Sequence, residues 1–426
     1  MDRERREDGA RAWIAGNLQR SVRASSDPDV RVYAGGQPQR MSPYEFARLV
    51  RKLKIFRWLE RFEFGSFLDL ASGFEHIPYL VTERYSVPAY YADMVHQFNL
   101  PIDGLFYGKL DHAVTLQLPV LPYRDDAFDV VLCSEVFEHL VRPIEAIAEM
   151  MRVARKYVVL TTLEGLAVNR WRRILSHWHV DVRVPHVERN FLVLDEFAAL
   201  FGDGWQHESL LYSPNFPASL VEAVTDQAPA YDALDDTDAL VAALCRAVSE
   251  GRHGPGSLGV VVVKPKAGAL VRPPRIQVDA ELARWLVAKA AFEEEWTQTA
   301  LGIWAALECN PALRPKDPAP DRPVAPALLA LLRCPDCGGP LDGAGTGARC
   351  GVCGQTFPGD WGVPILYSSR PADGALTDKA LSRLCGDSRR RRRVVRRIAR
   401  RLRRNERAPG PVRKLAWRLL PSPNAP

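Results

Sequence analysis

The sequence predicts an α/β protein: a Rossmann-like, doubly wound sheet of seven mostly parallel strands, followed by a small C-terminal zinc ribbon. Three observations predict it. Short apolar runs alternate with helical stretches between residues 42 and 266, as in a sheet with helical crossovers. These runs lack alternation with polar residues, which is typical of strands covered on both faces. Two Cys-x-x-Cys pairs near the C-terminus have the spacing of metal-binding knuckles.

The elements of the predicted sheet domain follow in chain order. A helix is expected to begin at Ser42, because Ser42 can cap it, Pro43 suits the first helical position and Glu45 completes a capping box. A second helix is expected from Arg142 to Ala154, with Pro143 at its start. The seven expected strands are SFLDLA, AYYADMV, AVTLQL, FDVVLCSEV, KYVVLTTL, ESLLYS and LGVVVVK.

The chain as a whole divides into six predicted segments. A linker with six prolines separates an N-terminal part from a C-terminal part, and such proline density disfavours both helix and central strand. Helical spacing of Leu282, Trp285 and Leu286 predicts a helical segment before that linker. The segments are a polar extension (1–41), the sheet domain (42–266), the helical segment (267–310), the linker (311–326), a zinc-ribbon domain (327–370) and a basic tail (371–426).

Charge is distributed unevenly along the chain. The net charge is +6, but residues 388–426 carry fourteen Arg, one Lys and one Glu, so residues 1–387 carry −8. Contact with a polyanion is therefore expected mainly at the tail. Val394, Ile398 and Leu402 recur there at helical spacing among the arginines, which favours an anionic membrane surface. RNA phosphates are the alternative partner, and a solvated tail without a partner is the third interpretation.

The start of the chain, MDRERREDGA, is charged and lacks the apolar core of a signal peptide. In the whole sequence, no apolar run approaches the roughly 20 residues that a membrane span needs. The expected location is the cytoplasm, with peripheral attachment at the inner membrane face if the tail binds lipid. The sequence leaves the oligomeric state open.

A turn of small residues follows the first predicted strand, in the sequence FLDLASG. Ligands of open parallel sheets bind outside the carboxyl ends of the strands, and a carboxylate at the tip of the next strand can accept from a ribose diol. A nicotinamide cofactor is disfavoured, because the glycines on which a pyrophosphate would lie are not all present. The candidate cofactor residues are therefore Asp69, Ala71, Ser72, Gly73 and Asp93.

The stretch LPYRDDAFDVVLCSEVFEHL (121–140) resembles the class I S-adenosylmethionine-dependent methyltransferases, in particular the branch with the ubiquinone and menaquinone biosynthesis enzymes. The matching residues are Leu121, Pro122, Tyr123, Asp125, Phe128, Asp129, Glu138 and His139. The resemblance covers residues 67–163 well and the rest of the sheet loosely.

This resemblance implies that S-adenosylmethionine is the cofactor. It implies that the turn at 69–73 lies near the methionine part, that Asp93 holds the ribose, that Gln117 meets adenine and that Ser134 lies beside the sulfonium. Two residues depart from the family's pattern. Ala71 and Glu75 stand where glycine is usual, and an alanine at 71 is expected to be tolerated if its φ is negative.

Methyl transfer to a hydroxyl or carbon needs a base that removes a proton. The candidates are Glu135 at the end of the fourth strand, His139 after it, and His186 in the loop HWHVDVRVPHVERNF. The alternative is that His139 satisfies a helix end and the loop histidines are ordinary surface residues. A metal site of His177, His179 and His186 has no diagnostic spacing.

The four clustered cysteines predict a closed structural zinc site that has no open position for catalysis. They are Cys334, Cys337, Cys350 and Cys353. The sequence QTFPGDWGVPILY that follows resembles small zinc-ribbon proteins that bind and activate RNA- and protein-modifying methyltransferases. Fusion in one chain would raise the ribbon's effective concentration at the catalytic domain. A purely structural role is the alternative.

The sequence thus predicts an S-adenosylmethionine-dependent methyltransferase that acts on a small molecule, a glycan or a lipid-linked sugar. One alternative is an rRNA or tRNA methyltransferase, which the ribbon resemblance and the arginine tail favour. The other is a catalytically inactive, methyltransferase-like scaffold, which the altered glycine positions favour.

Overall fold

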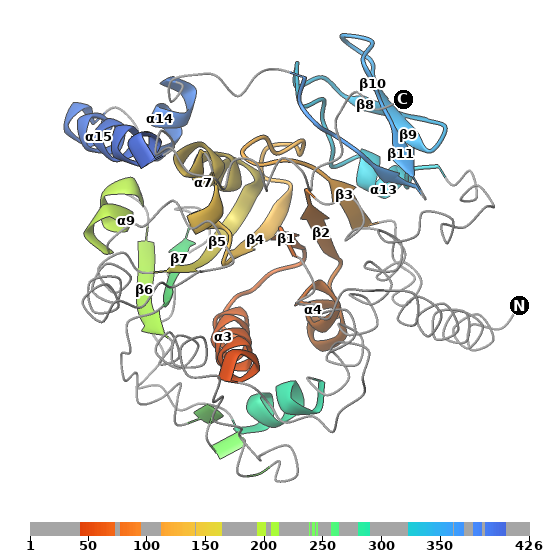
Figure 1. Ribbon diagram of the computed structural model, residues 1–426. Helices are drawn as coiled ribbons and strands as arrows, with labels where there is room; N and C mark the ends of the chain where they lie inside the picture. The colour runs from red at the N-terminus through yellow and green to blue at the C-terminus, as the bar shows by residue number, and fades with distance from the viewer. Residues whose placement is uncertain are drawn as a thin grey trace, which may run out of the picture.

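The structure is a computed structural model of the 426-residue chain. It describes residues 43–72, 77–94, 112–140, 142–163, 194–201, 206–212, 238, 241–242, 244–245, 257–263, 280–289, 323–360, 362–369, 378–385 and 388–405. A central sheet carries helices on both faces, and a small module of short strands lies beside one edge of it (Figure 1).

Within the described residues, the central sheet has seven strands in the order β3-β2-β1-β4-β5-β7-β6. Strands β1 to β5 are parallel to one another, and β7 runs antiparallel to both of its neighbours. The prediction of a doubly wound, mostly parallel sheet is therefore confirmed. The strands are β1 (Phe67–Leu70), β2 (Ala89–Asp93), β3 (Ala113–Thr115), β4 (Phe128–Ser134), β5 (Ala154–Leu163), β6 (Gln206–Tyr212) and β7 (Ser257–Val263).

The strand order reverses between β1 and β4, because β2 and β3 lie on one side of β1 while β4 and β5 lie on the other. Crossovers that leave in opposite directions open a crevice at the carboxyl ends of the two central strands. The residues of β1, β2 and β4 are buried except Ser134, as the continuous apolar runs predict for strands covered on both faces.

One face of the sheet is covered by α3 (Pro43–Leu59), α4 (Ile77–Tyr85) and the helical residues 280–289 (Figure 1). Their apolar side chains form one cluster with those of the sheet. Trp285 packs edge-on against Phe56 with ring centroids 5.4 Å apart, and the Arg84 guanidinium lies 5.0 Å from the Trp285 ring. The predicted helical pattern around Trp285 is confirmed over 280–289.

The other face is covered by α7 (Pro143–Val153) and α9 (Leu194–Phe201). Helices α14 (Asp378–Cys385) and α15 (Arg389–Asn405) pack on these two helices. Helix α7 begins with Pro143, as predicted, because proline lacks the N–H that the first helical turn leaves unbonded anyway. Figure 1 places α14 and α15 beside α7 and α9.

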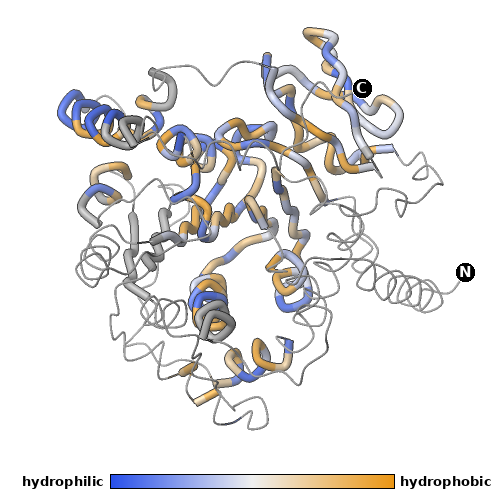
Figure 2. The backbone as a smooth tube through the Cα atoms, viewed as in Figure 1, coloured by the Kyte–Doolittle hydropathy of each residue, from blue (hydrophilic) through white to orange (hydrophobic). Residues whose placement is uncertain are grey.

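The packing of α15 bears on the expected use of its apolar side chains. Val395, Ile398 and Ala399 are buried, and they belong to the same hydrophobic cluster as α7 and α9. Of the three residues in the predicted stripe, Ile398 is buried in this cluster and Val394 packs against it, so both contact the chain itself. The side chain of Leu402 lies outside the described residues. Figure 2 shows α15 with strongly hydrophilic residues beside the hydrophobic ones. Among the described helices, none combines the length and the hydropathy that crossing a bilayer would take.

We use the name cysteine module for residues 323–369. It contains α13 (Pro326–Leu329), a three-stranded antiparallel sheet and a two-stranded one. The three strands are β8 (Leu341–Ala344), β9 (Gly347–Cys350) and β10 (Thr356–Phe357); the two are β11 (Gly359–Asp360) and β12 (Val363–Pro364). The prediction placed a small domain here, and the structure gives it short strands around paired turns.

The cysteine module is packed against the sheet domain. Backbone hydrogen bonds join Arg333 to Pro122 and Arg124 to Leu331, at 2.9 and 2.8 Å. Apolar residues of both parts share one buried cluster. Among the described residues, three parts of the chain also converge on Glu149 of α7, whose carboxylate meets Arg152 of α7 itself, Arg333 of the module and Arg383 of α14. These guanidinium groups outweigh the burial of Glu149 and lower the pKa of its carboxyl.

Candidate cofactor site and cysteine cluster

The carboxyl ends of β1, β2 and β4 bring three predicted cofactor residues together. In the register, Asp69 of β1 lies beside Tyr91 of β2 and Leu132 of β4. Asp93 lies two residues after Tyr91, and Ser134 lies two residues after Leu132. Side chains two residues apart in a strand point to the same face of the sheet. Asp69, Asp93 and Ser134 therefore share the sheet face that α3 covers.

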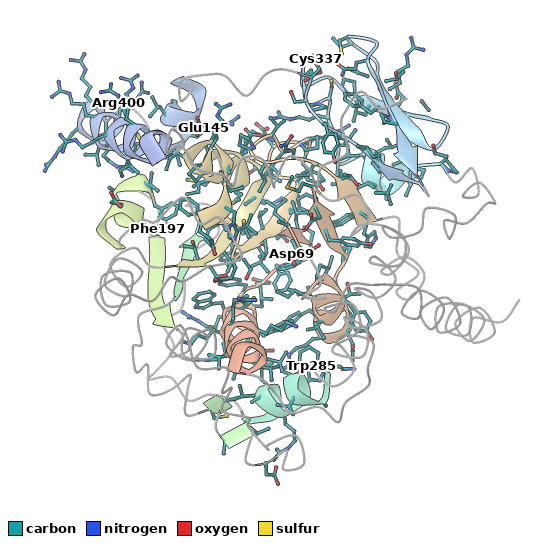
Figure 3. The ribbon with its side chains drawn as sticks, in the orientation of Figure 1. Asp69, Glu145, Phe197, Trp285, Cys337 and Arg400 are labelled. Atoms are coloured by element: carbon teal, nitrogen blue, oxygen red, sulfur yellow. The ribbon has the colours of Figure 1, made fainter. Side chains whose placement is uncertain are left out.

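Two of these residues are buried carboxylates. Asp69 is 2% exposed and Asp93 is 6% exposed. Burial raises the pKa of the Asp69 carboxyl well above its usual range, and the negative charge of Asp93 raises that pKa further. Arg51 and Lys52 of α3 act in the opposite direction, and Lys52 is itself buried. Figure 3 shows Asp69 in the middle of the sheet, above α3. The sequence did not single out these two cations, since their approach depends on the packing of α3.

The turn after β1 has an unusual backbone. Ala71 has φ = 56°, and its N–H donates to the carbonyl of Ala92 at 2.6 Å. The condition under which an alanine was expected to be tolerated at position 71, a negative φ, is therefore not met. The left-handed region costs an alanine about 1–2 kcal/mol, because its Cβ approaches the neighbouring carbonyl oxygen. Ser72 is buried behind this bend, while Gly73 and Glu75 lie outside the described residues.

We expect Ala71→Gly to raise the free energy of unfolding by about 0.5–1 kcal/mol, since glycine adopts a positive φ without a steric penalty. Urea unfolding followed by circular dichroism measures it. The matched control is Ala148→Gly within α7, where the same change should destabilise by about 1 kcal/mol. An equal decrease in the free energy of unfolding for Ala71→Gly and Ala148→Gly would show that the backbone at Ala71 is not strained.

The carboxyl end of β4 is held by β5. The Ser134 hydroxyl lies 2.8 Å from that of Thr161, and the Glu135 N–H donates to the Thr161 carbonyl at 2.8 Å. Glu135 has φ = 53°, so a second strained residue lies at this edge of the sheet. Such strain persists where surrounding contacts enforce it, and it is concentrated at functional sites.

One acidic residue near this edge matched the family's pattern but was given no role from the sequence. Glu138 is 2% exposed and accepts a hydrogen bond from the Thr162 hydroxyl at 2.9 Å. It lies in the 3-10 helix η2 (Phe137–His139), whereas its neighbour His139 is exposed. The apolar Phe137 beside it was the available signal, because a polar residue within a buried turn needs a partner.

The remaining predicted residues are placed as follows. Gln117 is exposed two residues after the end of β3, and Glu135 is half-buried at the end of β4. His186 and the rest of the loop between β5 and α9 lie outside the described residues. The structure thus brings together Asp69, Ala71, Ser72, Asp93, Ser134 and Glu135, and it leaves His139 and Gln117 at the surface.

The cysteine cluster is the second candidate site. The sulfur atoms of Cys334, Cys337, Cys350 and Cys353 all lie within 4.8 Å of one another. Two of the sulfur pairs are separated by 3.8 and 3.4 Å. A tetrahedral zinc ion with sulfur ligands at about 2.3 Å places its sulfurs about 3.8 Å apart, so this donor set fits zinc. Figure 3 shows Cys337 in the cysteine module, away from Asp69.

The two cysteine turns have the same construction. The N–H of Gly338 donates to the carbonyl of Cys334 at 2.9 Å, and that of Gly354 donates to Cys350 at 3.1 Å. Both glycines have a positive φ, at 78° and 74°. Hydrogen bonding from the Cys353 N–H lowers the pKa of the Cys350 thiol to about 6. Burial raises the pKa of the neighbouring Cys334 thiol, and a bound metal would hold all four cysteines as thiolates.

Comparison with known proteins gives one family match. Residues 108–160 match a family model described as a methyltransferase domain. This segment includes β3, β4 and α7, and hence Gln117, Ser134 and Glu135. Asp69 and Asp93 precede it. No curated protein matches the chain.

Solved structures that resemble the chain include the YcgJ protein from Bacillus subtilis, at 17% identity, with 50% of this chain and 98% of that one covered and a TM-score of 0.33. A SAM-dependent methyltransferase from Archaeoglobus fulgidus has 15% identity, 51% and 94% coverage and a TM-score of 0.30. Magnesium protoporphyrin IX methyltransferase from Synechocystis PCC 6803, with bound SAH, has 13% identity, 55% and 91% coverage and a TM-score of 0.34.

At these scores the three likenesses carry no argument of their own. The family match falls on the strands and the helix that build one half of the crevice described above. Residues 108–160 are thus similar to a methyltransferase domain, and they lie in a doubly wound, mostly parallel sheet.

Proposed function

We propose that this protein is an S-adenosylmethionine-dependent methyltransferase. The observation that carries the proposal is the pair of buried carboxylates, Asp69 and Asp93, at the carboxyl ends of β1 and β2. They lie beside a left-handed bend at Ala71, at the point where the strand order reverses. This is the crevice where open α/β sheets bind ligands.

The chemistry of these groups fits an adenosyl amino acid. Asp93 would accept hydrogen bonds from both ribose hydroxyls, since a carboxylate has four lone-pair positions. Asp69, close to the cations Arg51 and Lys52, would accept from the ammonium group or hold the turn. The exposed Gln117 would meet the edge of the adenine. A pyrophosphate would instead meet two carboxylates, which disfavours a dinucleotide.

The bound cofactor would supply an electrophilic methyl group. The chain's own residues would orient the acceptor and take its proton. Glu135 is the best placed of the predicted bases, because its backbone is fixed at the end of β4 by Thr161. His139 is exposed on η2 nearby, where a substrate loop could cover it.

Titration calorimetry with S-adenosylhomocysteine tests the proposal on the full-length protein. We expect binding in the micromolar range, with NAD and ATP at the same concentrations giving no competition. Competition by NAD would instead support a nicotinamide cofactor, which the sequence disfavours. Absence of any heat with S-adenosylhomocysteine or S-adenosylmethionine at millimolar concentration would support an inactive scaffold.

The acceptor proposed here is a small molecule, a glycan or a lipid-linked sugar, as the sequence suggested. A second candidate function is RNA methylation, which the position of α15 favours. With its apolar stripe packed inward, α15 presents exposed arginines to a partner. A surface of guanidinium groups without apolar residues between them suits phosphates better than insertion into lipid. Figure 3 shows Arg400 on this helix.

The arginine face can be tested with a quadruple substitution. Arg390, Arg393, Arg397 and Arg400 are exposed and recur on one side of α15. We expect their replacement by Gln to weaken binding to a structured RNA and to lower the slope of log K against log salt by about 3. Arg349→Gln, an exposed arginine of the cysteine module, is the control. If the quadruple variant binds RNA like the parent but loses binding to anionic vesicles, the result would support the membrane surface as the partner of the tail.

We further propose that the cysteine cluster holds a structural zinc ion. The support is the donor set of four thiols and the paired turns around it. Such a site has no open position, so its contribution would be to the folding of the module and to the surface that the module presents.

A further inference from the structure

The C-terminal edge of the cysteine module lies beside the candidate cofactor site. Ile365 forms a parallel bridge with Thr115, the last residue of β3. The Leu366 N–H donates to the Thr115 carbonyl at 2.8 Å, and Val363 shares a buried cluster with Tyr91 of β2 and Ala113 of β3. The segment 363–366 therefore extends the edge of the main sheet, and the chain leaves it at the carboxyl ends of β2 and β3.

The next residue is Tyr367. Its hydroxyl donates to the carbonyl of Met94 at 2.8 Å, and Met94 directly follows Asp93. Burial raises the pKa of the Tyr367 phenol, and the negative charge of Asp93 raises that pKa further. A side chain of the cysteine module is thus within electrostatic reach of the carboxylate that would hold the ribose.

The exposure of Tyr367 differs from that of its neighbours in the interface. Val363 and Leu366 are buried, as expected for residues that only join two parts of a chain. Tyr367 keeps 42% of its surface exposed, and Met94 beside it keeps 41%. Two large side chains with free apolar surface lie together at the end of β2. Their exposed apolar surface is available for contact with a ligand at this end of the strand.

We propose that Tyr367, although it belongs to the cysteine module, is a residue of the cofactor pocket whose aromatic ring contacts the adenosine half of the cofactor. The inference rests on the proposed function. The chemistry is that of a purine nucleoside on an aromatic face, with the phenol hydroxyl fixed on Met94. The module then completes the pocket of the sheet domain, and its contribution goes beyond covering the edge of β3.

A second set of contacts connects Tyr367 to the cysteine cluster. Asp336 lies between the ligands Cys334 and Cys337, and its carboxylate accepts from the hydroxyls of Ser368 and Ser369 at 2.6 Å each. The Ser369 N–H donates to the same carboxylate at 3.0 Å. These residues directly follow Tyr367. Asp336 is therefore a positioning residue, because it ties the chain after Tyr367 to the first cysteine turn.

The test is the affinity for S-adenosylhomocysteine and for adenosine, measured by calorimetry on the full-length protein. Stacking of a base on an aromatic side chain is typically worth a tenfold change or more. We expect Tyr367→Ala to raise both dissociation constants about tenfold, by the same factor for the two ligands. Tyr367→Phe keeps the ring and should raise them about threefold through the lost hydrogen bond. Asp336→Asn should weaken binding by an intermediate factor.

Two variants serve as matched controls. Tyr85→Phe removes a hydroxyl that donates to Glu60, and Val352→Ala removes an exposed apolar side chain of the module. Both should bind S-adenosylhomocysteine like the parent. Zinc content, measured on every variant, shows whether the module is still folded, and Tyr367→Phe remains informative if Tyr367→Ala loses its metal.

The outcomes separate the inference from the proposed function. If Tyr367→Ala and Tyr367→Phe bind like the parent while Asp93→Ala is weakened, the inference is wrong and the proposed function stands. If the parent itself binds neither S-adenosylhomocysteine nor adenosine, the proposed function is wrong and the inference falls with it. A larger loss for S-adenosylhomocysteine than for adenosine would place Tyr367 at the amino-acid end and overturn the assignment to adenosine.

Discussion

Replacing Asp93 by alanine is expected to weaken the binding of S-adenosylhomocysteine at least about 100-fold. Hydrogen bonds to a charged group contribute about 1.5–3 kcal/mol each, and the variant loses the bonds to two ribose hydroxyls. Asp93→Asn keeps one neutral acceptor, so a loss of about tenfold is expected. Calorimetric titration measures both. Affinities within a factor of two of the parent would show that Asp93 does not hold the cofactor.

The same substitution is expected to leave the folded state at least as stable as the parent at neutral pH. The pKa of Asp69 in the folded protein lies above its unfolded value, first through burial and then through the charge of Asp93. For such a group, the stabilisation that is present below the unfolded pKa is lost as the pH rises through the folded pKa. Removing Asp93 lowers the folded pKa of Asp69, so less stability is lost at neutral pH. Urea unfolding at pH 5 and pH 8 measures the change.

Asp129→Ala is the matched control for this pair of measurements. Asp129 is also a buried aspartate, but it lies at the opposite end of β4, where it accepts from the Gly65 N–H at 2.7 Å and from Arg155 at 3.0 Å. Its loss leaves a donor and a cation without their acceptor, so stability should fall by about 1–3 kcal/mol. Affinity for S-adenosylhomocysteine should stay unchanged. Asp93→Ala should therefore lower the affinity but not the stability, and Asp129→Ala should lower the stability but not the affinity.

Removal of zinc is expected to unfold the cysteine module. The free energy of structural zinc binding is of the order of 10 kcal/mol, and for a module of this size it is largely folding free energy. Chelation, or Cys334→Ser, should release about one zinc ion per chain and open residues 323–369 to proteolysis. Mass spectrometry of the fragments and a colorimetric zinc assay measure the two effects.

Unfolding of the module should also reach the sheet domain. Residues 363–366 would leave the edge of β3, and Leu328, Leu332 and Leu366 would leave the hydrophobic cluster that they share with Leu121 and Tyr123. A loss of cooperativity in the unfolding of the sheet domain is therefore expected. Cys385→Ser is the control, since Cys385 is buried in α14 and is not one of the four clustered cysteines, so its variant should keep its zinc. Proteolysis unaffected by chelation would contradict a structural metal.

Much of the fold could be predicted because its signals are local. Apolar runs without polar alternation identified the strands, and Pro143 marked the start of α7. The spacing of the four cysteines predicted a cluster that the structure brings within 4.8 Å. Asp69 and Asp93 could be chosen because each ends a predicted strand, and the ends of adjacent parallel strands meet. The backbone at Ala71 could not be foreseen, since its φ depends on the hydrogen bond to Ala92 of the next strand.

The α15 stripe shows the limit of such reasoning. Apolar residues at helical spacing among arginines predict an amphipathic helix, and α15 is one. The pattern does not say what covers the apolar side, because a lipid surface and the helices α9 and α14 present the same chemistry to valine and isoleucine. The tertiary structure places Val395 and Ile398 inside the protein, and only the arginine side is left for a partner.

The sequence by itself determined the strands, the cysteine spacing and the acidic strand ends, since each depends on residues close together in the chain. Tertiary structure alone decided which distant residues share a site. Tyr367 is 274 positions after Asp93 in the numbering, yet the edge of β3 accepts the segment before it and brings the phenol to the end of β2. The sequence around Tyr367 does not predict this pairing, because any extended segment can form hydrogen bonds with a sheet edge.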